Sequence, residues 1–473
     1  MLALAAERPS PAANPARDDA RSWNLTSDAG LVAMAIEGDG RLGSMFLGPA
    51  FPSLRYPGGG HVEHLFQAGL WIGGRTAGGD DRVSTVTEDA NDLIEQDELR
   101  EFTWDGRAPD LRSDLQGSDL YHPDAVATWE LLYGFDDLVS RPDHAPQLLH
   151  VDARLLAWDR PALDDGVVLE YAVTKLGGDP LSDVYVGLFA DATVGNTEVT
   201  DPYDPGAPIP WNWYDDLAGA WRPGEMPEDP DGWLWYRHDD DGDAGQATSW
   251  VGCRFLSLAP AAAPAPGLPP VSYNQWRYRQ VPPHDGQWLD DDGEWQPGKY
   301  QLLGNGHFDV GETPDIDFSA PGTWMSLLSS GPVPQLAAGD TLRVAFAFVC
   351  GADSVALAEN AAAFARWHAQ GYHAVGAPPA AAVASLAAPF PNPFNPGTIL
   401  RYRLDSPEDV RLVIHALDGS VVRTLVASRQ AAGPHAITWD GRDSGGRRAP
   451  SGRYVARLTA GTARLARGLT LVR

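Results

Sequence analysis

The stretch Pro389-Phe390-Pro391-Asn392-Pro393-Phe394-Asn395-Pro396 divides the chain into a long body and a tail of 85 residues. Its prolines fix φ and lack backbone donors, and each one disfavours the helical region for the residue before it. The stretch is therefore predicted to be extended and stiff. Its two phenylalanines need a hydrophobic surface on which to pack.

Short alternating runs follow this stretch as far as Arg473. Leu400, Tyr402 and Leu404 alternate with arginines, and Asp418-Gly419 has the composition of a hairpin turn. About seven short strands in roughly 80 residues are typical of a small immunoglobulin-like sandwich.

Five spaced motifs of the tail resemble a known family: Pro391-Asn-Pro-Phe-Asn-Pro396, Leu417-Asp-Gly419, Ala432-Gly433 followed by His435, Trp439-Asp-Gly-Arg-Asp443, and Ser451-Gly-Arg-Tyr454. They resemble the C-terminal sorting modules of the type IX (Por) secretion system and the related immunoglobulin-like domain named after FlgD. The resemblance implies a secreted or bacterial cell-surface protein, whose tail meets the export machinery or the outer-membrane surface. The family often has lysine near its terminus, where this chain has Arg467 and Arg473, so cleavage or retention of the tail stays open.

The body is predicted to be an antiparallel β-sandwich with one helix, so that the whole protein is mainly β. The 50 glycines and 40 prolines favour many turns. The apolar run Thr341–Cys350 predicts a strand buried on both faces. Asp353-Ser354 begins the helix and Gly371 ends it. Further strands are predicted at 127–133, 147–158, 167–174, 184–190 and 249–256, whereas 77–125, 191–245 and 271–323 are rich in loop signals.

The predicted organisation has four parts. Residues 1–22 form a disordered leader, 23–373 the β-rich body, 374–388 an Ala/Pro/Gly linker and 389–473 the immunoglobulin-like domain for sorting or anchoring. Parts of the body, Val62–Phe66 with Gly69–Gly74 and Asp183–Asp191, resemble uncharacterised secreted bacterial proteins that carry such tails. That resemblance implies location only.

Charge is distributed unevenly along the chain. The net charge is −29, yet the tail's 13 arginines and 6 acidic residues make it +7, which leaves −36 for the rest. An acidic body argues against nucleic acid and anionic membranes as partners and is compatible with cations. No stretch approaches the roughly 18 apolar residues of a transmembrane segment. Cys253 and Cys350 are compatible with free thiols or with one disulfide.

No motif of the body identifies a reaction: it lacks a Gly-x-Ser-x-Gly elbow, a phosphate loop and a Cys–His nucleophile pair. We therefore expect a structural or adhesive role without enzymatic activity, with self-assembly or polysaccharide as partner. One alternative is a polysaccharide-binding module, and another is a surface hydrolase with catalytic carboxylates. The polysaccharide-binding module would use four tryptophans to stack on sugar rings, namely Trp211, Trp213, Trp233 and Trp235. The alternative is that these tryptophans pack long loops onto the sandwich.

Calcium is the cofactor that the sequence favours most. Asn305, Gly306, Asp309 and Glu312 match the second half of a calcium loop, with Glu312 as the bidentate ligand. Further oxygens would come from Asp315 and Asp317. A second acidic loop has Asp239 and Asp241 at matching offsets. The alternative is that both loops are hydrated turns, in which Asp, Asn and Gly are common anyway.

Overall fold

The computed structural model confirms a mainly β protein in which the named strands pair in antiparallel fashion. The residues that the structure describes are 23–27, 29–45, 52–58, 60–87, 101–140, 144–160, 163–197, 199, 215–240, 242–260, 270–277, 298–304, 321–372, 384–386, 394–404, 407–416, 421–431, 433–460 and 463–472.

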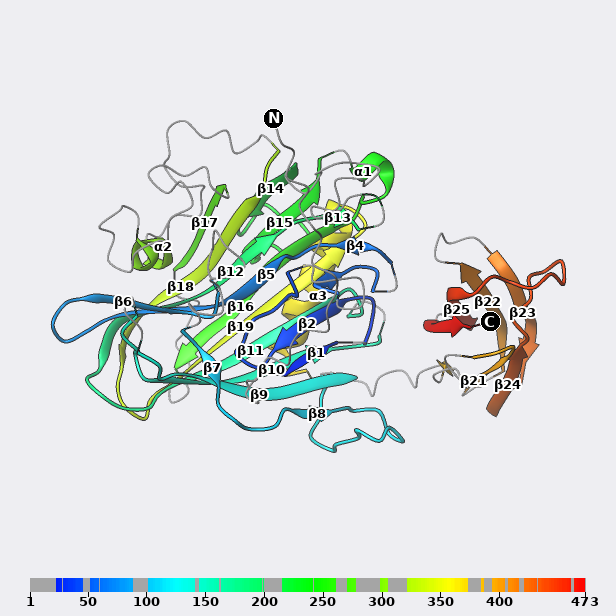
Figure 1. Ribbon diagram of the computed structural model, residues 1–473, viewed down its shortest axis with the longest axis horizontal. Helices are drawn as coiled ribbons and strands as arrows, with labels where there is room; N and C mark the ends of the chain where they lie inside the picture. The colour runs from blue at the N-terminus through cyan, green and yellow to red at the C-terminus, as the bar shows by residue number, and fades with distance from the viewer. Residues whose placement is uncertain are drawn as a thin grey trace, which may run out of the picture.

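Two large sheets build the body (Figure 1). The first has the order β17 (Val271–Arg277), β18 (Trp324–Leu336), β12 (Leu181–Ala192), β5 (Gln67–Arg75) and β6 (Asp81–Thr85). The second has the order β14 (Asp216–Trp221), β15 (Leu234–Asp239), β16 (Trp250–Pro260), β19 (Thr341–Gly351), β11 (Gly166–Lys175), β10 (Leu149–Ala157), β9 (Trp129–Asp137) and β7 (Thr103–Trp104), and β8 (Asp110–Arg112) also pairs with β9.

A third, smaller sheet has the order β1 (Asn24–Thr26), β2 (Ala33–Glu37), β3 (Leu54–Arg55), β4 (Val62–Glu63) and β13 (Gly195–Asn196). Alternating apolar residues of both large sheets meet in one core. Ile72 and Leu188 come from the first, and Leu169 and Phe346 from the second. Since successive strand residues point to opposite faces, the other half of each strand faces away from this core.

Strand β19 is buried on both faces, as its apolar run predicts. Phe346 and Phe348 face the core between the sheets, while Ala347 and Val349 belong to a second cluster on the outer face of the sheet. Cys253 and Cys350 are buried free thiols on the neighbouring strands β16 and β19.

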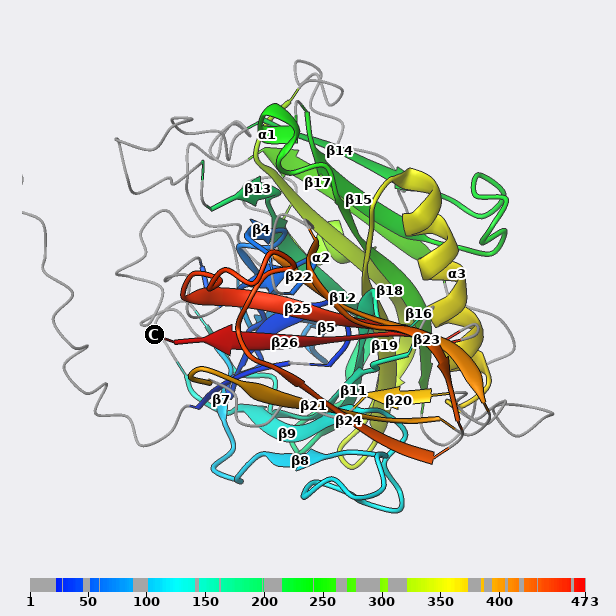
Figure 2. The same cartoon turned by 90° about the vertical axis from the view of Figure 1, so that its right-hand side faces the viewer.

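Helix α3 (Ser354–Ala369) covers part of that outer face, beside β16 and β19 (Figure 2). Its predicted start is confirmed, because the Asp353 carboxylate accepts a hydrogen bond of 2.8 Å from the Ala356 amide. Leu357 and Phe364 pack into the outer cluster. After the helix, Gly371 and Tyr372 both have positive φ, +61° and +63°, which turns the chain back onto the sheet. No helix in the described part of the chain is long and apolar enough to cross a membrane.

Several elements lie in segments that the sequence assigned to loops. They are β6, β7, β8, β13, β14, β15 and β17, with the short helices α1 (Gly242–Gly245) and α2 (Lys299–Gly304). Many of these strands are short or lie toward sheet edges, where tertiary pairing decides the structure more than local propensity does.

The tail is a small sandwich, as predicted (orange to red in Figure 1). One sheet has the order β20 (Ala384–Leu386), β21 (Thr398–Leu404) and β24 (Gly433–Trp439), and the other β23 (Val421–Gln430), β22 (Glu408–Ala416), β25 (Gly452–Ala460) and β26 (Ala463–Leu471). Phe394 is buried against Trp439 with ring centroids 5.4 Å apart, so one of the two phenylalanines has the packing surface that we expected.

The boundary between body and tail differs from the sequence prediction. Ala384–Leu386 pair with Leu404 to Tyr402 as strand β20, although these three residues fall in the predicted linker 374–388. The tail fold therefore begins before Pro389. Ala-rich composition hid this strand, because alanine contributes little to a β pattern.

Candidate functional site

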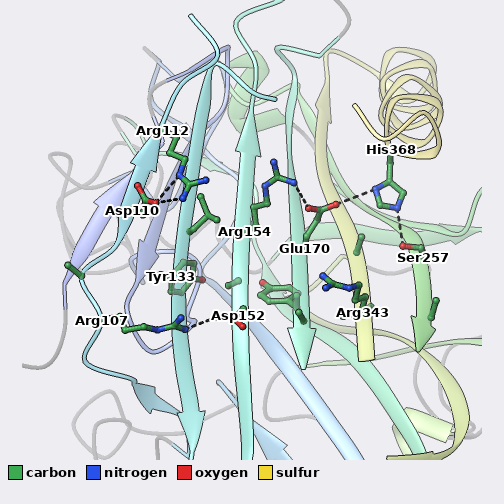
Figure 3. Close-up of a pocket in the computed structure, with 18 residues that line it drawn as sticks. Arg107, Asp110, Arg112, Tyr133, Asp152, Arg154, Glu170, Ser257, Arg343 and His368 are labelled. Carbon is green, nitrogen blue, oxygen red and sulfur yellow. Dashed lines mark hydrogen bonds and ion pairs between the residues drawn. The ribbon is translucent and has the colours of Figure 1, made fainter. Parts of the chain in front are cut away.

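A groove of about 690 Å³ lies on the outer face of the second sheet, where α3 ends (Figure 3). Strands β8, β9, β10, β11, β19 and β16 contribute to it. We call it the outer-face groove and define it by its charged and polar residues, which are Arg107, Asp110, Arg112, Asp152, Arg154, Glu170, Ser257, Arg343 and His368.

Strand register explains why these side chains meet. Residues that pair directly across antiparallel strands share a face. One row across the sheet runs through Asp110, Leu132, Arg154, Glu170, Ala345 and Ser257, and the next through Gly134, Asp152, Ala172, Arg343 and Ala259. The residues between these rows, such as Ala153 and Val344, face the core instead.

Most of the arginines in the groove are paired. Arg154 Nε lies 3.0 Å from Glu130 Oε1, and Arg154 Nη1 lies 3.2 Å from Glu170 Oε2. Arg107 donates to Asp152 at 2.7 Å. Although partial burial raises the pKa of Asp152, hydrogen bonds from Arg107 and His150 outweigh it and leave that pKa lowered.

Arg343 differs from these arginines. It is exposed on β19, and its side chain has no hydrogen-bond or ion-pair partner among the residues that the structure describes. Its row neighbour Ala172 is small, so the guanidinium is left accessible in the groove. A guanidinium presents a planar fork that fits a carboxylate, sulfate or phosphate.

A chain of hydrogen bonds leads from Ser257 into the groove wall. Ser257 Oγ lies 2.9 Å from His368 Nε2, and His368 Nδ1 lies 2.8 Å from the hydroxyl of Tyr372. That hydroxyl donates to Glu170 Oε1 at 2.6 Å. His368 Nδ1 is itself 3.8 Å from Glu170 Oε1, and Figure 3 shows His368 between Ser257 and Glu170.

The order of donors follows from the number of protons. The Tyr372 hydroxyl has one proton, which goes to Glu170, so its oxygen accepts from His368 Nδ1–H. His368 Nε2 is then unprotonated and accepts from the Ser257 hydroxyl.

Burial supports this protonation state. Burial lowers the pKa of His368, with Glu170 opposing and Arg254 reinforcing the shift, so the imidazole is neutral at pH 7. Burial, together with the Glu170 carboxylate, raises the pKa of Tyr372 well above its usual range, so Tyr372 keeps its proton. The left-handed backbone at Tyr372 places its ring against Trp158, with centroids 5.6 Å apart.

The predicted ligand-binding tryptophans divide into two pairs. Trp235 is fully buried, edge-on to Phe348 at 6.0 Å, and Trp233 packs partly buried against the same core. Trp235 therefore offers no ring face to a ligand, which matches the packing alternative. Trp211 and Trp213 lie outside the described residues.

The sequence reasoning missed an aromatic strip on the outer face of the same sheet. Trp221, Tyr236, His238 and Trp250 are each partly exposed on β14, β15 and β16. The rings of His238 and Trp250 are stacked with centroids 3.9 Å apart, and the ring centroids of Trp221 and Tyr236 are 4.5 Å apart. Period-two alternation was the available signal, since it points Tyr236 outward when Trp235 points inward.

The structure describes one of the seven predicted calcium ligands, Asp239. Asn305, Asp309, Glu312, Asp315, Asp317 and Asp241 lie outside the described residues. Asp239 is buried and accepts hydrogen bonds from the amides of Gly242 and Asp243, as in a capped turn. Within the described ranges, no group of three or more His, Cys, Asp or Glu side chains could hold a metal ion.

Comparison with known proteins identifies the tail. The family model of the FlgD Ig-like domain matches residues 395–464, which confirms that part of the predicted resemblance. No curated protein matches the chain.

The solved structures that are similar to this chain include three with low TM-scores. A polysaccharide lyase is 10% identical over 96% of this chain and 46% of its own, with a TM-score of 0.25. FlgD from P. aeruginosa is 22% identical over 19% of this chain and 64% of its own, with a TM-score of 0.14. Dimeric latent PorU from Porphyromonas gingivalis is 11% identical over 72% of this chain and 31% of its own, with a TM-score of 0.18. The chain thus spans less than two thirds of each, and these likenesses carry no conclusion about its activity.

Proposed function

We propose that this chain is a secreted or cell-surface protein with an adhesive role, whose body binds an acidic saccharide in the outer-face groove. The observation that carries the proposal is Arg343, an exposed arginine that lines a polar groove and has no side-chain partner among the described residues. Its guanidinium would bind the carboxylate or sulfate of the saccharide.

The rest of the groove fits a polyhydroxylated ligand. Asp152 and Glu170 can accept from hydroxyl groups, and Arg154 and Ser257 can donate to them. Six strands about 4.8 Å apart span roughly 24 Å, which is long enough for several sugar residues.

The charge of the body limits the choice of ligand. With −36 outside the tail, the surface repels densely charged polyanions such as nucleic acid. This repulsion is screened beyond about 8 Å at physiological ionic strength, whereas a contact with Arg343 is not. We therefore expect a saccharide with sparse acidic groups.

The aromatic strip supports a second candidate, which is stacking of neutral sugar rings on Trp221, Tyr236 and Trp250. Their partly exposed rings resemble the apolar platforms on which sugars pack. The two candidates are distinguishable, because a neutral saccharide would bind independently of Arg343.

Binding is tested with tetragalacturonate and its methyl ester by isothermal titration calorimetry. Arg343→Ala should weaken binding of the acid form about tenfold or more, because a hydrogen bond to a charged group contributes about 1.5–3 kcal/mol. Arg366→Ala is the matched control, since Arg366 is exposed on α3 and does not line the groove. An unmodified protein that does not bind the acid form, or an equal loss in both variants, would contradict the proposal.

Export or anchoring through the tail is the second half of the proposal, and the FlgD Ig-like domain at 395–464 supports it. Because β20 belongs to the tail sandwich, the deletion should begin at Ala384 rather than at Pro389. We expect the body to fold and to stay inside the cell envelope of a host with type IX secretion. Cell fractionation measures where the truncated protein is, and circular dichroism measures whether it is folded. Normal surface delivery of the truncated protein would refute the sorting role.

A further inference from the structure

We propose that Ser257 is a nucleophile activated by His368, and that the outer-face groove hydrolyses an ester. The activity would make this groove a hydrolytic site as well as a binding site. The substrate class, an O-acylated acidic saccharide, rests on the function proposed above, whereas the nucleophile itself rests on the hydrogen-bond geometry alone.

Local structure presents Ser257 to the groove. The β16–β19 register shifts between Phe255 and Ser257, so that Leu256 is an extra residue in β16. Such a bulge twists the strand and re-aims the neighbouring side chain. Ser257 is only partly buried and lines the groove, so an ester carbonyl can approach its hydroxyl.

The hydrogen-bond chain has the polarity that general-base catalysis needs. His368 Nε2 accepts from Ser257 at 2.9 Å, while Nδ1–H is held by the Tyr372 hydroxyl at 2.8 Å. Tyr372 in turn donates to Glu170 at 2.6 Å. Tyr372 and Glu170 are thus positioning residues, which hold the imidazole in the tautomer that can take the serine proton.

The reaction balances with water as the only co-reactant. Ser257 Oγ forms a bond to the acyl carbon while its proton passes to His368 Nε2. The ester C–O bond then breaks, and the alcohol leaves with that proton. Water attacks the acyl-serine and gives its proton to Nε2, and the carboxylic acid departs as the proton returns to Ser257 Oγ.

The Arg343 guanidinium has five N–H donors, so we assign it to the oxyanion as well as to the acidic group of the saccharide. It lies on β19, one row from Ala345, and Ala345 pairs directly with Ser257. Diagonal neighbours across antiparallel strands are within reach of a long side chain. A cation directed at the developing negative charge would stabilise the tetrahedral intermediate.

Covalent labelling with a fluorophosphonate probe tests the nucleophile directly in the full-length protein. Peptide mapping should find the label on Ser257, and Ser257→Ala should reduce the labelling rate at least 100-fold. The matched control is Ser182→Ala, since Ser182 is exposed on β12 outside the groove. Ser257→Ala should likewise slow the hydrolysis of p-nitrophenyl acetate, whereas Ser182→Ala should not.

Failure of this inference is distinguishable from failure of the binding function. Retained tetragalacturonate binding with no label on Ser257 would overturn the nucleophile and leave the binding proposal intact. Specific labelling of Ser257 without tetragalacturonate binding would overturn the binding proposal and leave the nucleophile intact. If Ser257→Ala does not fold, His368→Gln gives the same test, because it keeps Ser257 and removes the base.

The positioning role has its own readout. Tyr372→Phe keeps the ring against Trp158 but breaks the connection to Glu170. Among the described residues, Glu170, Arg254 and Tyr372 act on His368, and Arg343 lines the same groove. Because the charge of Glu170 raises the pKa of His368, Glu170→Gln should move the midpoint of the pH–labelling profile to lower pH, whereas Tyr372→Phe keeps that charge. A change in stability with an unmoved midpoint in Glu170→Gln would mean that Glu170 is only structural.

Discussion

A buried cluster around His144 should make the stability of the body depend on pH. His144 Nε2 lies 2.7 Å from Asp137, and His144 Nδ1 lies 3.3 Å from Glu101. Glu101 also accepts from Thr85 on β6 at 3.0 Å, whereas Asp137 ends β9. The cluster therefore ties the first sheet to the second, and the His144 side chain is only 1% exposed.

The pKa of His144 sets the size of the effect. Burial acts to lower this pKa, but the contacts with Asp137 and Glu101 outweigh it and raise it to about 9. An ordinary histidine titrates near 6.5, so the difference of about 2.5 units corresponds to about 3 kcal/mol. The folded state holds the proton more tightly, so this stability is fully present below about pH 6.5 and is lost as pH rises through 9.

The partner carboxylate acts in a different pH range. Burial would raise the pKa of Glu101, yet Lys299 and His144 leave it lowered. Its contribution is therefore present above the pKa of an unfolded glutamate and is lost in acid, below the window in which His144 titrates.

Urea unfolding at about pH 6 and about pH 9.5 measures the effect when the unmodified protein is compared with His144→Gln. We expect the difference in unfolding free energy between these two proteins to shrink by about 3 kcal/mol at the higher pH. For a body of about 350 residues, that equals a shift in melting temperature of about 4 °C. His122→Gln is the control, since that side chain is 39% exposed. An equal difference at both pH values would refute the reasoning.

Three further predictions concern the tail, the helix and calcium. Phe394→Ala should destabilise the tail by about 3–4 kcal/mol, because it leaves a cavity beside Trp439. Thermal unfolding followed by Trp439 fluorescence measures this, and an equal effect of Val421→Ala, which removes a side chain that is 52% exposed, would contradict it. Asp353→Ala should cost about 1 kcal/mol in urea unfolding, because α3 loses its cap, whereas the exposed Glu359→Ala should not. Millimolar calcium should raise the melting temperature relative to chelator through the Asn305 loop. Asp309→Ala and Glu312→Ala should abolish that rise, and an unchanged melting temperature of the unmodified protein would exclude the site.

The elements that could be predicted are those whose residues agree locally. The run Thr341–Cys350, the cap Asp353 and the alternation after Pro396 each lie within a few residues of sequence, and each appears in the structure as predicted. In contrast, Leu234–Asp239 is a strand that was assigned to a loop. Its residues Trp235 and Asp239 carry strand and loop signals respectively, and only pairing with β14 and β16 decides between them.

The outer-face groove could not be predicted in the same way. Ser257, His368 and Glu170 are separated by more than 80 residues, and none belongs to a nucleophile motif. The burial of Trp235 also depends on strand alternation. Trp235 and Tyr236 are neighbours in sequence, but the alternation of the strand buries the first and leaves the second partly exposed.

The sequence by itself determined the β class, the main helix, the immunoglobulin-like tail and the contrast in charge between tail and body, because these depend on composition and on short-range periodicity. Only the tertiary structure decided which polar side chains meet. The pairing of β11, β19 and β16 sets Glu170, Ala345 and Ser257 in one row, and the turn at Gly371 brings Tyr372 back to His368. Strand register is a property of the assembled sheet, since a slip of one residue would turn each of these side chains to the opposite face.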